Sequence, residues 1–295
     1  MSPETLIVPK LSKLTYDMQK YHINLDHAIR KYQREGIDPE KVLASNNRQV
    51  ESLNNLTDFL KDAKVIGRNR LNKTIAAGAN LIIALGGDNH FLYVSHFING
   101  QLLLGINSDP TSSEGALTYF TVKSLKDFWS KLEADDFKIE EWPRLQIALN
   151  GKKIQALATG DIFIGESRRE NMSRYLISLD GQEEEQKSSG LLITTGAGST
   201  GWYDSACHYL FENGNKFPKT KQEARYLVTE VYRGKLSKYQ MLEGGFGPGQ
   251  KLIISSLNDS SGEISIDSLV RCKFNRGSQA IIEISDKPLR VISLN

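Results

Sequence analysis

The chain has 295 residues, of which 39% are apolar and 24% charged, as in a soluble globular protein with one large domain or two of ordinary size. Its net charge of +2 gives no reason to expect a nucleic-acid partner, and no apolar run approaches the ~18 residues of a membrane span. The two cysteines, Cys207 and Cys272, show neither a CxxC pair nor a metal-ligand spacing, which excludes a disulfide framework and favours a reducing compartment. The first residues lack the pattern of a signal or transit peptide, so we expect a cytoplasmic protein.

The first part of the chain alternates between predicted strands and helices. Apolar runs ended by glycine or proline predict strands, and apolar residues at helical spacing predict helices. The predicted strands are residues 6–9, 63–66, the run 81–88 and 102–107. The predicted helices are residues 12–31, 47–63, 73–77, 91–97 and 124–132, with Gly36 and Asp38-Pro39 as breakers. This alternation is typical of a layered parallel sheet.

The pattern changes near Phe137, after which most segments are strand-like. The predicted strands are residues 138–150, 153–158, 161–164, 175–179, 190–195, 226–231, 251–256, 263–266, 280–284 and 289–294. Asn150-Gly151 and Asp180-Gly181 are expected to form turns, and one helix is expected from residue 202 to 211. The acidic run 183–185 is interpreted as a solvated turn without metal-ligand spacing, and residues 244–249 as a flexible loop. We predict an α/β first part followed by a mostly β second part.

The strand that ends at Gly86, Gly87 and Asp88 is the most informative segment. In open α/β sheets, ligands bind just past the carboxyl ends of the strands. The two glycines let backbone N–H groups approach a phosphate, and Asp88 is placed to act as a base or to meet a metal. The alternative is an ordinary strand-to-helix turn in which Asp88 caps the helix and His90 is a surface or core histidine.

Two further turns are candidates for the same chemistry. Gly196 to Gly201 matches the G-x-G-x-x-G pattern after a predicted strand, but the match is isolated, amid β structure and without a clear βαβ unit. An anion-binding turn at a helix N-terminus is still physically sensible there. Asn107 to Pro110 is another turn at the end of a strand that could face the same cleft, although simple turn chemistry is the favoured interpretation of this segment taken alone.

Taken in order, these motifs resemble the NAD kinase family, and most closely its mitochondrial-type branch. The motifs are Gly-Gly-Asp at 86–88, Gly-Ile-Asn-Ser-Asp-Pro at 105–110, Asp-Ile-Phe-Ile-Gly-Glu-Ser at 161–167, Lys-Ser-Ser-Gly at 187–190 and Gly-x-Gly-Ser at 196–199. The run 11–16 and the tail 264–294 fit as well, so the resemblance covers nearly the whole chain.

The resemblance implies an enzyme that transfers the γ-phosphate of ATP, with Mg²⁺, to the 2′-hydroxyl of the adenosine ribose of NAD, giving NADP. It implies an α/β domain with a Rossmann-like parallel sheet at 1–136, a β-rich dinucleotide-binding domain at 137–275 and C-terminal strands at 276–295 that return to the first domain. The active site of the family lies between the domains. Its partners are small-molecule nucleotides rather than nucleic acid or membrane, and most members are homo-oligomers, either dimers or tetramers.

Site residues carry over position by position. Asp88 matches the proposed catalytic base, and Asp161 matches an acidic residue that holds ribose hydroxyls. The remaining nucleotide-binding positions are Gly86, Gly87, Asn89 and His90 beside the base, Asn107 and Asp109 in the NxDP turn of the branch, and Ser199, Thr200, Gly201 and Ser205 along the adenine and ribose pocket. No residue is expected to be a dedicated metal ligand.

The chain also departs from the family pattern. The family's GGDGT continues here with Asn89 and His90, its Asn-acid pair is Gly160-Asp161, and the usual threonine of the glycine-rich turn is Ala197. His90 is able to replace lost phosphate contacts by donating its own hydrogen bond. Three hypotheses follow: an NAD kinase, a nucleotide-binding relative with lost or redirected activity toward another nucleoside or sugar, and an oxidoreductase that uses the glycine-rich turn at 196–201.

Overall fold

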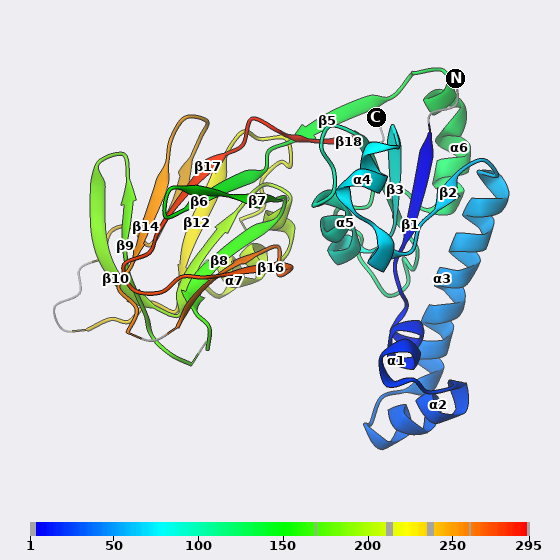
Figure 1. The fold of residues 1–295 in the computed structure, drawn as a ribbon, viewed down its shortest axis with the longest axis horizontal. Helices are drawn as coiled ribbons and strands as arrows, with labels where there is room; N and C mark the ends of the chain where they lie inside the picture. Colours follow the sequence, from blue (N-terminus) through cyan, green and yellow to red (C-terminus); the bar gives the residue numbers. More distant parts are fainter. Residues whose placement is uncertain (1–3, 169, 211–214, 235–238, 260, 294–295) are drawn as a thin grey trace. The chain divides into compact units, whose positions relative to one another are not determined.

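The computed structural model describes residues 4–168, 170–210, 215–234, 239–259 and 261–293. The chain divides into two compact units, Met1–Glu140 with Arg290–Asn295, and Glu141–Leu289. The first unit is α/β and the second is mostly β, which confirms the predicted fold class (Figure 1). The predicted ends of a helix at Phe211 and of the last strand at Leu294 lie outside the described residues.

The first unit is built on a six-stranded sheet with the order β2-β1-β3-β4-β18-β5. Its strands are β1 (Thr5–Pro9), β2 (Lys64–Val65), β3 (Leu81–Gly86), β4 (Leu102–Asn107), β5 (Lys138–Trp142) and β18 (Leu289–Ser293). The pairs β1–β2, β1–β3, β3–β4 and β4–β18 are parallel. Every residue of β3 is buried, as expected of a central parallel strand that is covered on both faces.

Helices cover both faces of this sheet. They are α1 (Lys13–Tyr21), α2 (Leu25–Arg34), α3 (Pro39–Phe59), α4 (Lys73–Ala77), α5 (Asp88–Ser95) and α6 (Val122–Glu133), with a 3₁₀ turn at Arg68–Arg70. Leu56 of α3 and Phe128 of α6 share one core cluster with Ile106 of β4. On the opposite face of β4, a β-carbon at Gly105 would lie 2.8 Å from the ring of Phe91, so α5 packs there closely. The helices cover the faces of the sheet, whereas the carboxyl ends of β3 and β4 are followed directly by loops.

Two helix predictions in this unit were wrong in their limits. The predicted helix 12–31 is two helices, because His22 adopts the left-handed conformation (φ 53°) and Asn24 caps α2 by accepting the N–H of His27. The predicted helix 47–63 begins earlier, at Pro39. The Asp38 side chain accepts the N–H groups of Glu40 and Lys41, and proline suits the first helical position. Of the expected breakers, Gly36 lies in the turn after α2, and Asp38-Pro39 begin α3.

The second unit consists of two six-stranded antiparallel sheets and one helix, as far as the described residues go. The first sheet has the order β10-β9-β14-β17-β6-β7 and the second β13-β12-β11-β8-β15-β16. Their strands are β6 (Leu145–Leu149), β7 (Lys152–Ala158), β8 (Asp161–Glu166), β9 (Ser173–Leu179), β10 (Gln182–Ser188), β11 (Gly190–Thr194), β12 (Ala224–Thr229), β13 (Glu243–Phe246), β14 (Leu252–Ser256), β15 (Gly262–Ile266), β16 (Val270–Lys273) and β17 (Gln279–Ile284). A 3₁₀ turn at Gly198–Thr200 leads into α7 (Trp202–Leu210).

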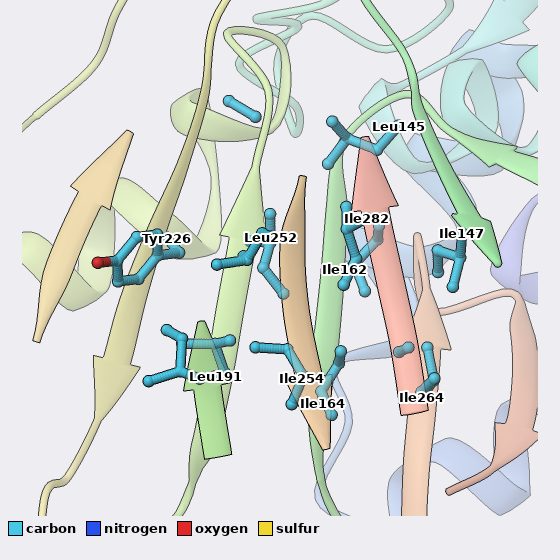
Figure 2. Packing of buried hydrophobic residues seen from close by; sticks show 14 of the residues in the cluster. Leu145, Ile147, Ile162, Ile164, Leu191, Tyr226, Leu252, Ile254, Ile264 and Ile282 are labelled. Carbon is cyan, nitrogen blue, oxygen red and sulfur yellow. The ribbon is translucent and has the colours of Figure 1, made fainter. Parts of the chain in front are cut away.

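The core of this unit lies between the two sheets. Ile254 and Ile282 from the first sheet and Ile164 and Leu191 from the second belong to one buried cluster (Figure 2). Burial alternates along β14 and β15, so each strand turns one face inward.

Several details of the second unit differ from the sequence predictions. The acidic run 183–185 lies inside β10, so it is not a turn. The predicted loop 244–249 begins inside β13, which ends at Phe246, and only residues 247–249 form a turn. The turns at Asn150-Gly151 and Asp180-Gly181 are confirmed, with all four residues at positive φ. The predicted returning segment at 276–295 is longer than observed, because β17 pairs with β14 and β6 while β18 joins the first unit.

Candidate functional site

Asp88 lies at the junction of β3 and α5, where the sequence predicted a ligand site. Gly87 is the N-cap of α5, and Asp88 is its first residue. The Asp88 carboxylate accepts the backbone N–H of Leu117 at 2.8 Å and that of Ala116 at 3.0 Å. Its side chain is partly exposed. Two donors therefore fix the carboxylate while leaving it accessible to a ligand.

The turns after β3 and β4 meet at the same edge of the sheet. Gly86 pairs with Asn107 in the parallel ladder, and Ser108 donates its N–H to the Gly86 carbonyl at 3.2 Å. The Asn107 side chain accepts the N–H of Asp109 at 3.1 Å and donates to the Ser113 carbonyl at 2.9 Å. A β-carbon at position 87 would lie 2.8 Å from the Ser113 hydroxyl, so the two turns approach each other closely here. Gly86, Gly87, Asp88 and Asn107 thus lie together at this edge of the sheet.

Asp109 belongs to this edge but is turned toward α3. It is buried, and Arg48 donates to it from Nε at 2.6 Å and from Nη2 at 3.3 Å. Ser45 donates its hydroxyl to the same carboxylate at 2.6 Å. Burial acts to raise the pKa of Asp109, but the hydrogen bonds from Arg48, Ser45 and Ser112 outweigh it and hold that pKa below its ordinary value. The carboxylate is an anion fully engaged with protein groups.

His90 and Asn89 lie on different sides of α5. His90 is 1% exposed, and its Nε2 lies 2.8 Å from the Val8 carbonyl, the geometry of a neutral imidazole donating to that oxygen. Burial lowers the pKa of His90 to about 4, while the hydrogen bond to Val8 opposes the shift. This placement favours the alternative of a core histidine, and contact with phosphate stays an untested prediction. The Asn89 side chain is exposed.

In the second unit, Asp161 begins β8 beside the glycine-rich turn. Its Oδ1 is shielded from solvent and has no hydrogen-bond partner among the described residues. Burial raises the pKa of Asp161 to about 7; Thr194 opposes the rise by hydrogen bonding, and the charge of Asp267 adds to it. A β-carbon at position 198 would collide with Asp161 Oδ1, so Gly198 allows the turn and the carboxyl to touch.

A second carboxylate, that of Asp267, holds the backbone under Asp161. It accepts three consecutive N–H groups, from Thr159 at 2.9 Å and from Gly160 and Asp161 at 2.8 Å each. Arg144, 2% exposed, contributes a positive charge that interacts with Asp267; burial lowers the pKa of Arg144 to about 10 and the interaction opposes this. Asp267 is thus a buried anion in a nest of backbone donors.

The glycine-rich turn is organised by its own hydroxyl groups. Ser199 is buried, donates to the Gly196 carbonyl at 2.8 Å and accepts the N–H of Phe217 at 3.1 Å. Thr200 donates to the Ala197 carbonyl at 2.9 Å. Gly201 and Ser205 are exposed at the start of α7, and the Ser205 hydroxyl donates to the Gly201 carbonyl at 3.3 Å. β11, which precedes the turn, is antiparallel to β8 and β12, so this motif lacks the βαβ unit of a dinucleotide oxidoreductase.

Sequence reasoning missed the partners that hold the predicted residues. Ser45 and Arg48 of α3 were not singled out, nor were Asp267 and the amides of Ala116 and Leu117. The signal for the α3 residues was a polar stripe at helical spacing, which is common on any helix surface. Asp267 and Ser268, both at positive φ, lie in the turn of the β15–β16 hairpin, and β16 was not predicted as a strand.

Across the described ranges, no three or more His, Cys, Asp or Glu side chains gather in a way that would hold a metal ion. Within the same ranges, no helix is both long and apolar enough to cross a bilayer.

Comparisons with known proteins give sequence matches to proteins named NAD kinase or NADH kinase. No family model matches the chain. A rice protein named "Probable NADH kinase" is 26% identical over 237 residues, which is 73% of this chain and 71% of the rice protein. "NAD kinase" of Methanopyrus kandleri is 33% identical over 137 residues, 45% of this chain and 48% of its own. Human "NAD kinase 2, mitochondrial" is 23% identical over 248 residues, 67% of this chain and 56% of its own.

Solved structures extend the likeness to the whole chain. An NAD kinase from Archaeoglobus fulgidus in complex with ATP superposes with a TM-score of 0.66 at 16% identity, over 98% of this chain and 93% of that one. Yeast NADH kinase complexed with NADH gives a TM-score of 0.68 at 13% identity, over 100% of this chain and 85% of that one. The fold is therefore that of the NAD kinases. The sequence matches are likewise to proteins named NAD kinase or NADH kinase.

Proposed function

We propose that the protein is a kinase that transfers the γ-phosphate of ATP to the 2′-hydroxyl of the adenosine ribose of NAD. NADH is the second acceptor to be assayed beside NAD. Similarity to proteins named NAD kinase and NADH kinase supports the reaction class, and these names include both acceptors. The observation that carries the proposal is the Asp88 carboxylate, held by two backbone amides at the carboxyl end of β3 and still partly exposed.

In phosphoryl transfer, the main requirement on Asp88 is that its carboxylate be correctly placed. In phosphoryl transfer, the ribose oxygen forms a bond to the γ-phosphorus while the bond from that phosphorus to the ADP oxygen breaks. The hydroxyl proton passes to a carboxylate oxygen of Asp88. Each of its oxygens keeps a lone pair beyond the one used by Ala116 or Leu117, so the fixed carboxylate can accept and orient the hydroxyl.

Phosphate binding is proposed for the first turn of α5. The N–H groups that begin a helix lack partners within it and favour anions. Gly86 and Gly87 lead the chain to this turn, and the exposed Asn89 amide can donate to an oxygen of ATP. We leave His90 out, because its ring is buried against Val8.

The described residues fit a Mg²⁺ ion that arrives with the nucleotide. They contain no cluster of three ligating side chains, and Mg²⁺ commonly keeps waters and phosphate oxygens with one or two carboxylates. Asp88 is the carboxylate we propose to face it. When bound, the ion would supply neutralisation of phosphate charge.

Recognition of the acceptor is proposed for the second unit. Asp161 has an unpartnered, shielded Oδ1, which suits a hydrogen bond with a ribose hydroxyl. Thr200, Gly201 and Ser205 are proposed to line the nucleoside, while Ser199 shapes the turn. A cytoplasmic location and a homodimeric or tetrameric state remain part of the proposal, to be checked by fractionation and by light scattering.

The test is formation of NADP or NADPH by the purified protein with Mg²⁺, ATP or polyphosphate, and NAD or NADH. Asp88→Asn should lower kcat by at least about 100-fold, the usual contribution of a positioned acid or base. Asp58→Asn, which changes an exposed carboxylate of α3, is the matched control and should be unaffected. Full activity in Asp88→Asn would remove Asp88 from the reaction.

A redirected family member is the second candidate, favoured by the exposed Asn89 side chain and by Gly160 in place of an amide side chain. Measurable binding of NAD without NADP formation would support it. Other nucleosides and sugars would then be tested as acceptors with the same Asp88→Asn control.

A further inference from the structure

The loop between β4 and α6 connects α3 to Asp88. At one end of this loop, Asp109 and its neighbours contact α3. At the other end, the amides of Ala116 and Leu117 contact the Asp88 carboxylate. The contacts at both ends lie within the first unit.

The contacts with α3 come from one face of the helix. Ser45, Arg48 and Ser52 are spaced three and four residues apart, so their side chains project in the same direction. Arg48 grips Asp109 with two nitrogens, at 2.6 and 3.3 Å, and donates to the Ser112 hydroxyl at 3.1 Å. Ser52 donates to the Ser108 carbonyl at 2.9 Å. The bidentate pair fixes the direction as well as the position of the Asp109 carboxylate.

Only a few residues of the loop separate Asp109 from the amides that contact Asp88. Asn107 ties Asp109 to Ser113 through its side-chain amide. Gly115 then turns the chain at φ +71°, and a β-carbon there would lie 2.6 Å from the Asn107 amide nitrogen. The two N–H groups that follow the turn are the donors to Asp88. The loop is therefore short and tightly packed between its two anchors.

We propose that Arg48 and Asp109 are positioning residues that set the orientation of Asp88 through the loop at 107–117. The inference rests on the proposed function, since it assigns the pair a role in phosphoryl transfer. Neither side chain needs to touch a nucleotide. The Asp109 carboxylate accepts hydrogen bonds from Arg48 and Ser45. The backbone amides at the other end of the loop then orient the Asp88 carboxylate.

The test combines a kinetic measurement with one that needs no activity. Arg48→Met keeps the side-chain stem and removes the fork, Arg48→Lys keeps the charge, and Arg30→Met on an exposed position of α2 is the control. We expect Arg48→Met to lower kcat about tenfold with KM for NAD and ATP little changed, because small misplacement of a catalytic group is costly. Arg48→Lys should recover part of the loss, and Arg30→Met should match the wild type.

Hydrogen exchange of the nucleotide-free protein reports on the loop itself. Peptides that contain Ala116 and Leu117 should exchange faster in Arg48→Met, while β1 and β3 keep their protection. Unchanged exchange at these amides would overturn the proposal, as would faster exchange throughout the first unit, which would show a merely structural role. If the wild type makes no NADP or NADPH, the proposed function fails, and the exchange result still decides whether the pair orients the loop.

Discussion

Asp267 and Asp161 are joined by two hydrogen bonds, one to the Asp267 side chain and one between their backbones. The Asp267 carboxylate accepts the N–H of Asp161 at 2.8 Å, and the N–H of Asp267 donates to the Asp161 carbonyl at 2.8 Å. One buried acid therefore fixes the main chain of another, whose own carboxyl is left with a shielded oxygen. The position of Asp161 depends on a residue of a distant hairpin.

Replacing Asp267 tests this dependence. Asp267→Asn keeps the shape but turns an NH₂ group toward backbone donors, so we expect the free energy of unfolding to fall by about 2 kcal/mol, as for loss of charge-assisted hydrogen bonds. Urea denaturation measures the change. Asp286→Asn, at an exposed position of the same unit, is the control. Equal stability of the two variants would mean that the three contacts contribute little.

Asp161 predicts a pH dependence of stability with an unusual sign. Its pKa is raised to about 7 in the folded protein, from an ordinary value of 3.8, mainly by burial. Between these values the folded protein binds a proton that the unfolded chain releases, so this contribution to stability falls as pH rises. As pH rises from 5 to 8, the free energy of unfolding of Asp161→Asn should therefore increase relative to that of the wild type by about 1 kcal/mol or more. A constant difference across that range, measured by denaturation at each pH, would contradict the shift.

His90 predicts the opposite sign over nearly the same range. Burial lowers its pKa to about 4 from 6.5, so below pH 6.5 the unfolded chain takes up a proton before the folded one does. The contribution of His90 is complete above pH 6.5 and is lost as pH falls toward 4. The stability advantage of the wild type over His90→Gln should shrink between pH 7 and pH 4.5. His27→Gln, on the exposed face of α2, should show no such trend.

Much of the fold was predictable because local patterns and tertiary structure agree. The apolar runs that became β3 and β4 are buried on both faces, and the turn at Asn150-Gly151 has the residues that its left-handed backbone favours. Predictions failed where local signals were ambiguous. Three glutamates suggested a turn, yet β10 is an edge strand, where charged side chains are accommodated.

The candidate site was predictable in part, for the same reason. Asp88 was found because strand ends carry ligands, and the glycines around it mark close backbone approach. Its supports were not found, because they are distant in sequence. Arg48 lies 61 residues from Asp109, and Asp267 lies 106 residues from the amide of Asp161. No local pattern specifies such pairs; they exist only once the sheets have formed.

The place of β18 between β4 and β5 has a consequence for biosynthesis. A ribosome adds about 5–20 residues per second, and domains usually assemble in the order in which they emerge. Here the strand that joins β5 to the rest of its sheet leaves the ribosome after the entire Glu141–Leu289 unit. The sheet of the first unit can therefore be completed only after the second unit has been translated.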